Sequence, residues 1–349
     1  MAVPFRDLPS AAARLLADAA AAGVAARQRV QAAVADIALP GPARLSDYQR
    51  AAVSRMAEGI LLDLEGALAR GIAERLGEHA PPVLVERETP IALPVLERAG
   101  LPHDVELVAL LLRRATEHRL GRRLRRTGGP GPLEAILGDA DVEIARAAAA
   151  VLTAEARRYD GFHDAALPLV DLPGELLHRL VWSVAAALRI ELVQRDDLPA
   201  AAVDRAAAAA AQALLAGHDE AAGFDGRALA LVRTLDRAGR LEDDAVADFA
   251  EGGQVAVTVA ALAHRAALDP AGAWEMALDP AGSRLAVLLR AAGLGGEGAG
   301  RILAAWLVHP RDIGEIGEDL ASLSEADARE ATRLWRLDPA FRAAIQALA

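Results

Sequence analysis

The sequence predicts an all-helical fold built from short helix pairs. In its composition, 53% of the residues are apolar but only 3% are aromatic, so the core has to form from alanine, leucine and valine. Alanine has the highest helix propensity and is depleted in strands. In addition, apolar residues recur every three or four positions. No segment alternates apolar and polar residues with the β-branched side chains of a strand.

Residues 133–152 show this plan most clearly. A short apolar arm ends at Gly138, which tolerates the left-handed conformation of a helix end. Asp139 or Asp141 then caps a second helix. We expect Arg146 to face outward, and the buried stripe to consist of Val142, Ala145, Ala149 and Leu152. A pair this short cannot bury its own apolar face, so pairs of this kind have to stack.

The other elements follow from caps and breakers. Residues 10–38 predict an alanine-rich helical hairpin. Residues 46–61 and 63–78 predict helices, the first of them capped by Ser46 or Asp47. Further helices are expected from 103 or 104 to about 126, over 173–194, and over an alanine-rich run that ends before Gly217. The inward face of the helix over 173–194 is expected to consist of Leu177, Leu180, Val181, Val184 and Leu188. From Phe224 onward, Asp-Pro pairs and other caps mark successive helix starts. We therefore expect a hairpin at 1–42, a HEAT-like repeat region at 43–195 and an acidic helical domain at 196–349.

Charge and composition limit the classes of function. Arginines and acidic residues are equal in number over residues 1–160, so the net charge of −11 comes from residues 161–349. An acidic second half repels nucleic acid and anionic lipid. The chain has no cysteine, which excludes disulfides, thiol nucleophiles and cysteine-bound metals. No signal peptide or membrane-spanning run is recognisable in the sequence, which favours a cytoplasmic protein.

Four stretches of the chain resemble a known family in pattern and order. They cover residues 60–76, 91–111, 171–189 and 259–294. On these residues the chain resembles the bacterial domain-of-unknown-function family 2336, whose members carry HEAT-like helical repeats. The resemblance implies an α-helical interaction protein, an α-solenoid in architecture, and transfers no catalytic residue.

The densest charge cluster lies between Arg113 and Arg126. On a helix, one face of this cluster would carry Arg119, Arg122, Arg123 and Arg126. Guanidinium groups bind carboxylates and phosphates through paired hydrogen bonds, so this face is a candidate docking patch for an acidic protein segment or a phosphate. The alternative is that these arginines are solvated at a helix C-terminus, where the negative end of the helix dipole stabilises positive charge.

A second candidate is His178, which is followed by Arg179 on the predicted helix 173–194. An accessible imidazole beside a cation suits a phospho-accepting histidine, although an ordinary surface histidine has the same pattern. Of the four tryptophans, each sits at helical spacing and is expected to anchor the core. Any that is exposed would be a candidate interface residue.

The sequence lacks the patterns that a dinucleotide- or phosphate-binding loop and a metal site require. The glycines between Gly293 and Gly300 follow a helical pattern instead of a strand, and the chain has no lysine, so we interpret them as a helix connector. The eight histidines form no close ligand motif, so no metal and no cofactor is expected.

The sequence therefore favours a non-catalytic, cytoplasmic scaffold or adaptor. Its partner is expected to be another protein, either acidic or a signalling protein, with no nucleic acid and no membrane; self-association is left open. The alternative is a signalling phosphotransfer component that uses His178. A weaker alternative is a HEAT-like nucleic-acid-binding protein, which the net acidity disfavours.

Overall fold

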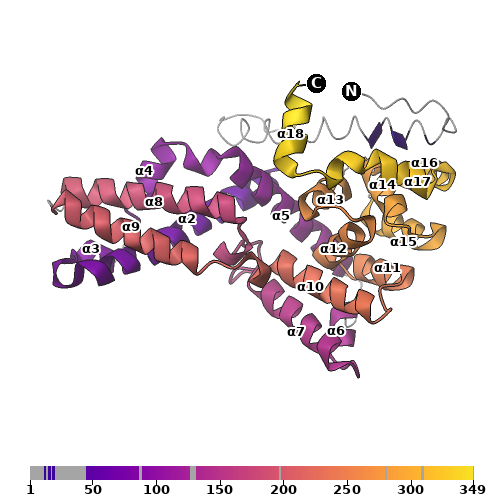
Figure 1. The fold of residues 1–349 in the computed structure, drawn as a ribbon, viewed down its shortest axis with the longest axis horizontal. Coiled ribbons are helices and arrows are strands. Elements are labelled where there is room, and N and C mark those ends of the chain that lie inside the picture. Colours follow the sequence, from indigo (N-terminus) through magenta and orange to yellow (C-terminus); the bar gives the residue numbers. More distant parts are fainter. Residues whose placement is uncertain are drawn as a thin grey trace. The chain divides into compact units, whose positions relative to one another are not determined.

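A computed structural model describes residues 45–85, 89–125, 131–195, 198–279, 281–307 and 310–348, with five positions between Ala12 and Ala19 (Figure 1). Every element in these residues is a helix, and a single bridge between Tyr159 and Ala165 is their only strand-type pairing. The expected all-helical class is confirmed. The hairpin expected at 10–38 lies outside the described residues, apart from those five positions.

The chain divides into two compact units. Unit 1 contains Met1–Arg29, Thr116–Thr153 and Asp225–Ala349, and unit 2 contains Val30–Ala115 and Ala154–Phe224. The domain boundary expected at residue 196 falls between two helices that pack together in unit 2. Sequence order alone therefore does not define the units, because helices distant in the chain associate.

Unit 2 is built around three long helices. These are α2 (Asp47–Leu76), α8 (Gly174–Arg195) and α9 (Ala200–Ala216), each of which packs against the other two (Figure 1). Smaller elements surround them: η1 (Gly77–His79), α3 (Pro82–Val85), α4 (Leu93–Arg98), η2 (Leu101–His103), the first half of α5 (Val105–Leu124), η4 (Leu169–Asp171) and η5 (Glu220–Ala222).

The local signals that start and orient α2 and α8 are those the sequence indicates. Ser46 and Gln49 form a capping box at the start of α2, which satisfies free N–H groups there. The expected inward face of α8, at 177, 180, 181, 184 and 188, is buried. In α2, Leu64, Leu68 and Ile72 are likewise fully buried.

Small side chains allow α2 and α9 to approach closely. A Cβ atom built on Gly71 would lie 3.0 Å from the Cβ of Ala210, which is tighter than ordinary packing. Ala206, Ala207 and Ala211 are buried on the same helix. Interiors are close-packed, so larger residues at this crossing would force the helices apart.

A fully buried glutamate fixes α4 to α2. Glu65 lies in the middle of α2 with no exposed surface. Its carboxylate accepts hydrogen bonds from the backbone N–H groups of Ile91 (2.8 Å), Ala92 (3.1 Å) and Leu93 (3.2 Å). These groups stand at the N-terminus of α4, where no intrahelical acceptor exists. The side chain therefore caps one helix from the interior of another.

Unit 1 contains the remaining helices. They are the second half of α5, α6 (Pro132–Ile136), most of α7 (Val142–Ala156), α10 (Phe224–Arg237), α11 (Asp243–Glu251), α12 (Val255–Ala266), α13 (Pro270–Ala277), α14 (Ser283–Ala291), α15 (Gly296–Trp306), α16 (Pro310–Ser322), α17 (Glu325–Ala331), η6 (Arg333–Arg336) and α18 (Pro339–Leu348). α11 packs against α15, and α14 packs against α17. In a regular solenoid each repeat contacts only its neighbours in the chain. The helices in these two pairs are not consecutive, so their contacts do not by themselves indicate a solenoid.

The core of unit 1 contains two of the tryptophans expected there. Trp274 and Trp306 are buried, and the indole N–H of Trp306 donates to the Ala250 carbonyl at 3.2 Å. Arg284 is also buried, with 1% of its surface exposed. It pairs with Glu275 at 2.7 Å and lies over the Trp335 ring at 5.8 Å. A buried cation of this kind needs such a partner to offset its lost hydration.

The buried face expected for α7 is wrong. Val142 is 65% exposed, and Ala149 is also exposed. The inward residues are instead Ile144, Ala148 and Val151. This alanine-rich helix carries apolar residues on all its sides, so the periodicity of its sequence does not identify the buried face. Asp141 does cap the helix, through Glu143 N–H at 2.9 Å, and Arg146 is exposed as expected.

The Glu65→Ala variant tests the buried cap of α4. It would leave three buried N–H groups without an acceptor, so we expect the free energy of unfolding to fall by about 3 kcal/mol or more. Urea titration followed by circular dichroism measures this change. Glu74→Ala, at an exposed position of the same helix, should change the free energy by less than about 0.5 kcal/mol. Equal effects of the two variants would contradict the assigned role.

Candidate functional site

The arginine face on α5 is partly used inside the protein. Arg119 and Arg122 are exposed, whereas Arg123 donates to the carbonyls of Ala305 (2.6 Å) and Trp306 (2.8 Å). These carbonyls lie at the C-terminal end of α15, where they lack intrahelical donors. Burial, together with the charge of Arg119, lowers the pKa of Arg123. Arg126 lies outside the described residues, so the exposed part of the patch described by the structure is Arg119 and Arg122.

His178 lies on the exposed side of α8 and has a fixed neighbour. Its Nε2 atom is 3.1 Å from the indole N–H of Trp182, and the two rings meet edge to face. Because that N–H can only donate, Nε2 accepts, and the proton of the neutral imidazole lies on Nδ1. The adjacent Arg179 pairs with Asp104 (3.2 Å) and Glu106 (2.7 Å). Phosphorylation at Nε2 would require the Trp182 indole to move, so the phosphotransfer role stays a prediction.

The residues between α7 and η4 form an ordered loop. We call Tyr159–Ala165 the Phe162 loop. Tyr159 and Ala165 form a bridge, and Asp160 N–H donates to the Asp164 carbonyl at 3.0 Å. The Asp160 carboxylate accepts from the N–H groups of Phe162 (2.8 Å) and Asp164 (2.9 Å). One side chain therefore holds both sides of the turn.

The electrostatics of Asp160 favour its ionised form. The two backbone hydrogen bonds, first from Asp164 and then from Phe162, lower the pKa of Asp160, and loss of hydration opposes them. The next carboxylate in the loop, Asp164, pairs with Arg55 at 3.1 Å. His163 has a φ of 60°, a left-handed conformation that is uncommon for a residue with a Cβ. Such strain persists only where surrounding contacts impose it.

Two buried arginines hold the base of the loop. Arg158 is 1% exposed; it pairs with Asp171 at 3.0 Å and lies 4.4 Å from the centre of the Phe224 ring. Arg114 donates to the carbonyls of Arg158 (2.6 Å) and Ala166 (3.2 Å), one on each side of the loop. All these residues belong to unit 2. The loop is therefore anchored to the interior by charge-assisted hydrogen bonds, which are stronger than neutral ones.

The anchored loop exposes an aromatic side chain. Phe162 is 90% exposed, the largest exposure among the large hydrophobic residues that the structure describes. Burying such a side chain is favourable by about 1.5–3 kcal/mol, so its exposure runs against the hydrophobic effect. Phe162 is not among the candidate residues predicted from the sequence. The available signal was an aromatic residue inside a polar turn of a chain that is only 3% aromatic.

Some classes of site are absent from the described part of the chain. Within it, no helix is both long enough and apolar enough to cross a membrane. In the same residues, no three histidine, aspartate or glutamate side chains gather closely enough to hold a metal ion.

The described residues define an all-helical protein with an ordered loop that exposes Phe162 to solvent. The chain belongs to the family described as "Uncharacterised protein conserved in bacteria (DUF2336)", whose model matches residues 91–334. This confirms the family resemblance found in the sequence. No curated protein and no solved structure matches the chain.

The order of the Phe162 loop should depend on the ionisation of Asp160. Because the folded loop lowers the pKa of this residue, the loop is fully stabilised above the unfolded value of about 3.9 and loses that stabilisation as pH falls through the lowered value. In an NMR titration, the amide resonances of Phe162 and Asp164 should shift with a midpoint below about 3.9. Asp160→Asn should abolish this transition.

Circular dichroism across the same titration verifies that the helices remain folded. A midpoint at or above the unfolded value, with intact helices, would contradict the assigned hydrogen bonds.

Proposed function

We propose that this chain is a non-catalytic interaction protein that binds another protein by inserting Phe162 into an apolar cavity of that partner. The observation that carries the proposal is the combination of 90% exposure with a loop held by Asp160 and by two buried arginines. We place this interaction in the cytoplasm, as the sequence analysis expects.

The rigidity of the loop supports a binding role. Binding normally costs free energy to immobilise side chains and loops, and a loop already ordered in the free protein avoids much of that cost. Aromatic side chains are enriched at protein interfaces, where a few buried residues contribute most of the affinity. An ordered loop that projects Phe162 has both properties.

The charges around Phe162 favour a protein over a membrane as its partner. Asp160 and Asp164 flank the aromatic ring within two residues, and the whole chain carries a net charge of −11. The cytoplasmic membrane surface is negative, so these groups oppose insertion of the ring among anionic lipids. A protein cavity with a neutral or basic rim has no such penalty.

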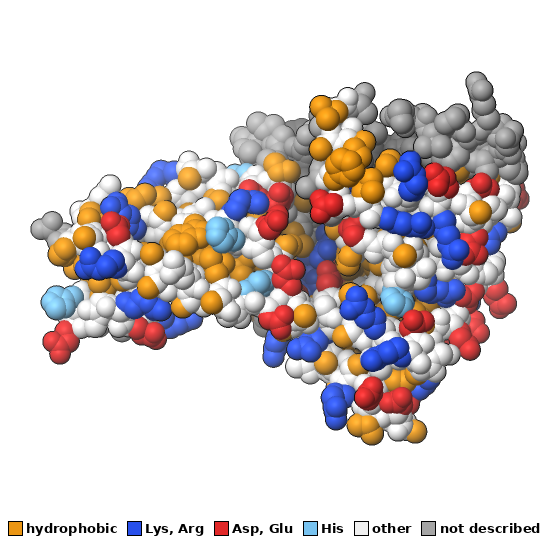
Figure 2. Space-filling view, in the orientation of Figure 1, with side chains coloured by type: hydrophobic (Ala, Val, Ile, Leu, Met, Phe, Trp, Pro, Cys, Tyr) orange, Lys and Arg blue, Asp and Glu red, His pale blue; other side chains and the backbone are white. Residues whose placement is uncertain are grey.

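A single phenylalanine is too small to form an entire interface. Aromatic residues bury about 150–250 Å² each, whereas a stable interface buries about 800 Å² on each partner. Unit 2 exposes further apolar surface on α8, where Trp182 and Ile190 are each 36% exposed. Figure 2 shows hydrophobic side chains gathered beside a histidine over α8 and α9. Trp182 therefore meets the condition set in the sequence analysis for a candidate interface residue.

The proposal does not require the solenoid arrangement. A concave surface of stacked HEAT-like repeats remains a prediction from the sequence, as does an acidic segment docked on Arg119 and Arg122. Both would add contacts to the same class of partner.

Affinity purification of the full chain from its own bacterial host tests the proposal. Phe162→Ser should lose a stoichiometric protein partner that Phe162→Leu retains, because leucine keeps the apolar contact. With the purified partner, calorimetry should show a dissociation constant for Phe162→Ser about 10- to 150-fold weaker, the equivalent of burying one such side chain.

The matched control is Phe341→Ser, at a residue 57% exposed on α18. It should leave the partner and its affinity unchanged. If Phe162→Ser captures the same proteins with the same affinity as the wild type, Phe162 is not the contact.

A further inference from the structure

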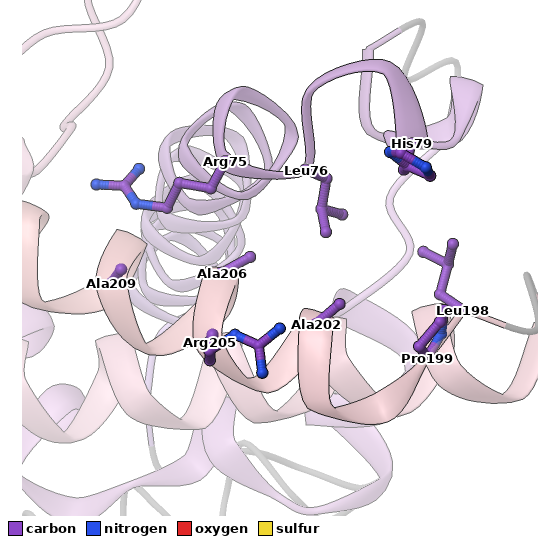
Figure 3. A pocket seen from close by; sticks show the side chains of 9 residues that line it. All are labelled: Arg75, Leu76, His79, Leu198, Pro199, Ala202, Arg205, Ala206 and Ala209. Carbon is purple, nitrogen blue, oxygen red and sulfur yellow. The ribbon is translucent and has the colours of Figure 1, made fainter.

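Unit 2 also contains a groove between the C-terminal end of α2 and one face of α9. Its volume is about 520 Å³ (Figure 3). Four of its lining residues, Pro199, Ala202, Ala206 and Ala209, recur at spacings of three and four and so share one face of α9. At about 1.5 Å per residue, this face runs for about 15 Å. The groove is therefore elongated along the helix.

The groove is narrow, and most of its lining side chains are apolar. Alanine side chains leave space along α9, and Leu76 and Leu198 add larger apolar surface. In Figure 3, Arg75 and Ala209 lie at one end, His79 and Leu198 lie at the other, and the Leu76 side chain points between the two ends. An unbranched apolar chain matches this shape better than a bulky ring does.

All ionisable groups that line the groove are basic. They are Arg75, His79 and Arg205, and no acidic residue is among the lining residues. Arg75 donates through Nη1 to the Gly71 carbonyl at 2.7 Å, which leaves its other N–H groups available. Among the described residues, Arg205 has no hydrogen bond or ion pair. The N-terminus of α9, whose N-cap Pro199 provides no side-chain cap, adds positive potential at the end near Leu198.

We propose that this groove binds an aliphatic chain that ends in a carboxylate, with the chain along the alanine face of α9 and the carboxylate paired with Arg205. The two parallel N–H groups of a guanidinium match the two oxygens of a carboxylate. The groove has the volume of a small-molecule site, about 300–1,000 Å³. It is too small for a protein partner, which would contact about 20–30 residues on each side. This site goes beyond the proposed protein-binding role and does not depend on Phe162.

Calorimetric titration of the full chain with decanoate tests the proposal. Wild-type protein should bind one decanoate saturably, should bind decanol more weakly, and should show no detectable binding of acetate at the same concentrations. Ala202→Leu places a larger side chain in the groove and should weaken decanoate binding about tenfold or more, because the leucine occupies space that the aliphatic chain needs. Arg205→Gln should weaken binding about three- to fivefold, the range for an exposed ion pair. High salt should reduce the difference in affinity between the wild type and Arg205→Gln.

Two matched variants control for general effects on the protein. Ala213→Leu adds the same side chain at an exposed position of α9 outside the groove, and Arg233→Gln removes an exposed arginine of α10. Both should bind decanoate like the wild type. Circular dichroism verifies folding, and Arg205→Gln alters only a surface residue, so it tests the site even if Ala202→Leu unfolds.

Three results would overturn the proposal. The first is the absence of saturable decanoate binding to the wild type. The second is unchanged binding by Arg205→Gln together with unchanged binding by a folded Ala202→Leu variant. The third is tighter binding of decyl phosphate than of decanoate, which would contradict the carboxylate as the bound group.

Discussion

Close contact between small side chains is the constraint on which unit 2 depends. A Cβ atom added to Gly71 on α2 would lie only 3.0 Å from the Cβ of Ala210 on α9, so a larger residue at position 71 would press against α9. This contact joins helices more than one hundred residues apart, and α8 packs against both. Other alanines of α9, Ala202, Ala206 and Ala209, line the groove beside this contact. In a chain poor in aromatic residues, alanine therefore contributes both to the close packing of the core and to the open space of the groove.

Charged side chains complete the fold by satisfying backbone groups. Glu65 accepts from the N-terminus of α4, Arg123 donates to the C-terminus of α15, and Arg114 donates to both sides of the Phe162 loop. The chain has no lysine, and it uses guanidinium groups, which reach several carbonyls in fixed directions. An ionised partner strengthens each of these hydrogen bonds. Glu65 and Arg114, which resemble surface charges in the sequence, are parts of the interior.

Helix caps and some buried faces could be predicted from neighbouring residues in the sequence. Contacts between segments that are distant in the sequence could not. Each cap was predicted as one of two residues, and the structure shows Ser46 and Asp141 in these roles. The inward face of α8 was correctly predicted, since it depends on residues within a few positions. The face of α7 was not, because alanine on all sides removes the periodic signal. Neither the role of Arg123 nor the anchoring of Phe162 could be deduced, since their partners lie far away in the sequence.

Contact of Phe162 with another protein is the central functional claim. A photoreactive phenylalanine analogue at position 162 of the full chain, irradiated in the native host, tests it most directly. The account predicts one dominant protein adduct, identified by mass spectrometry, that does not form when the analogue replaces Phe341. Adducts with lipid alone, or the same proteins from both positions, would contradict it.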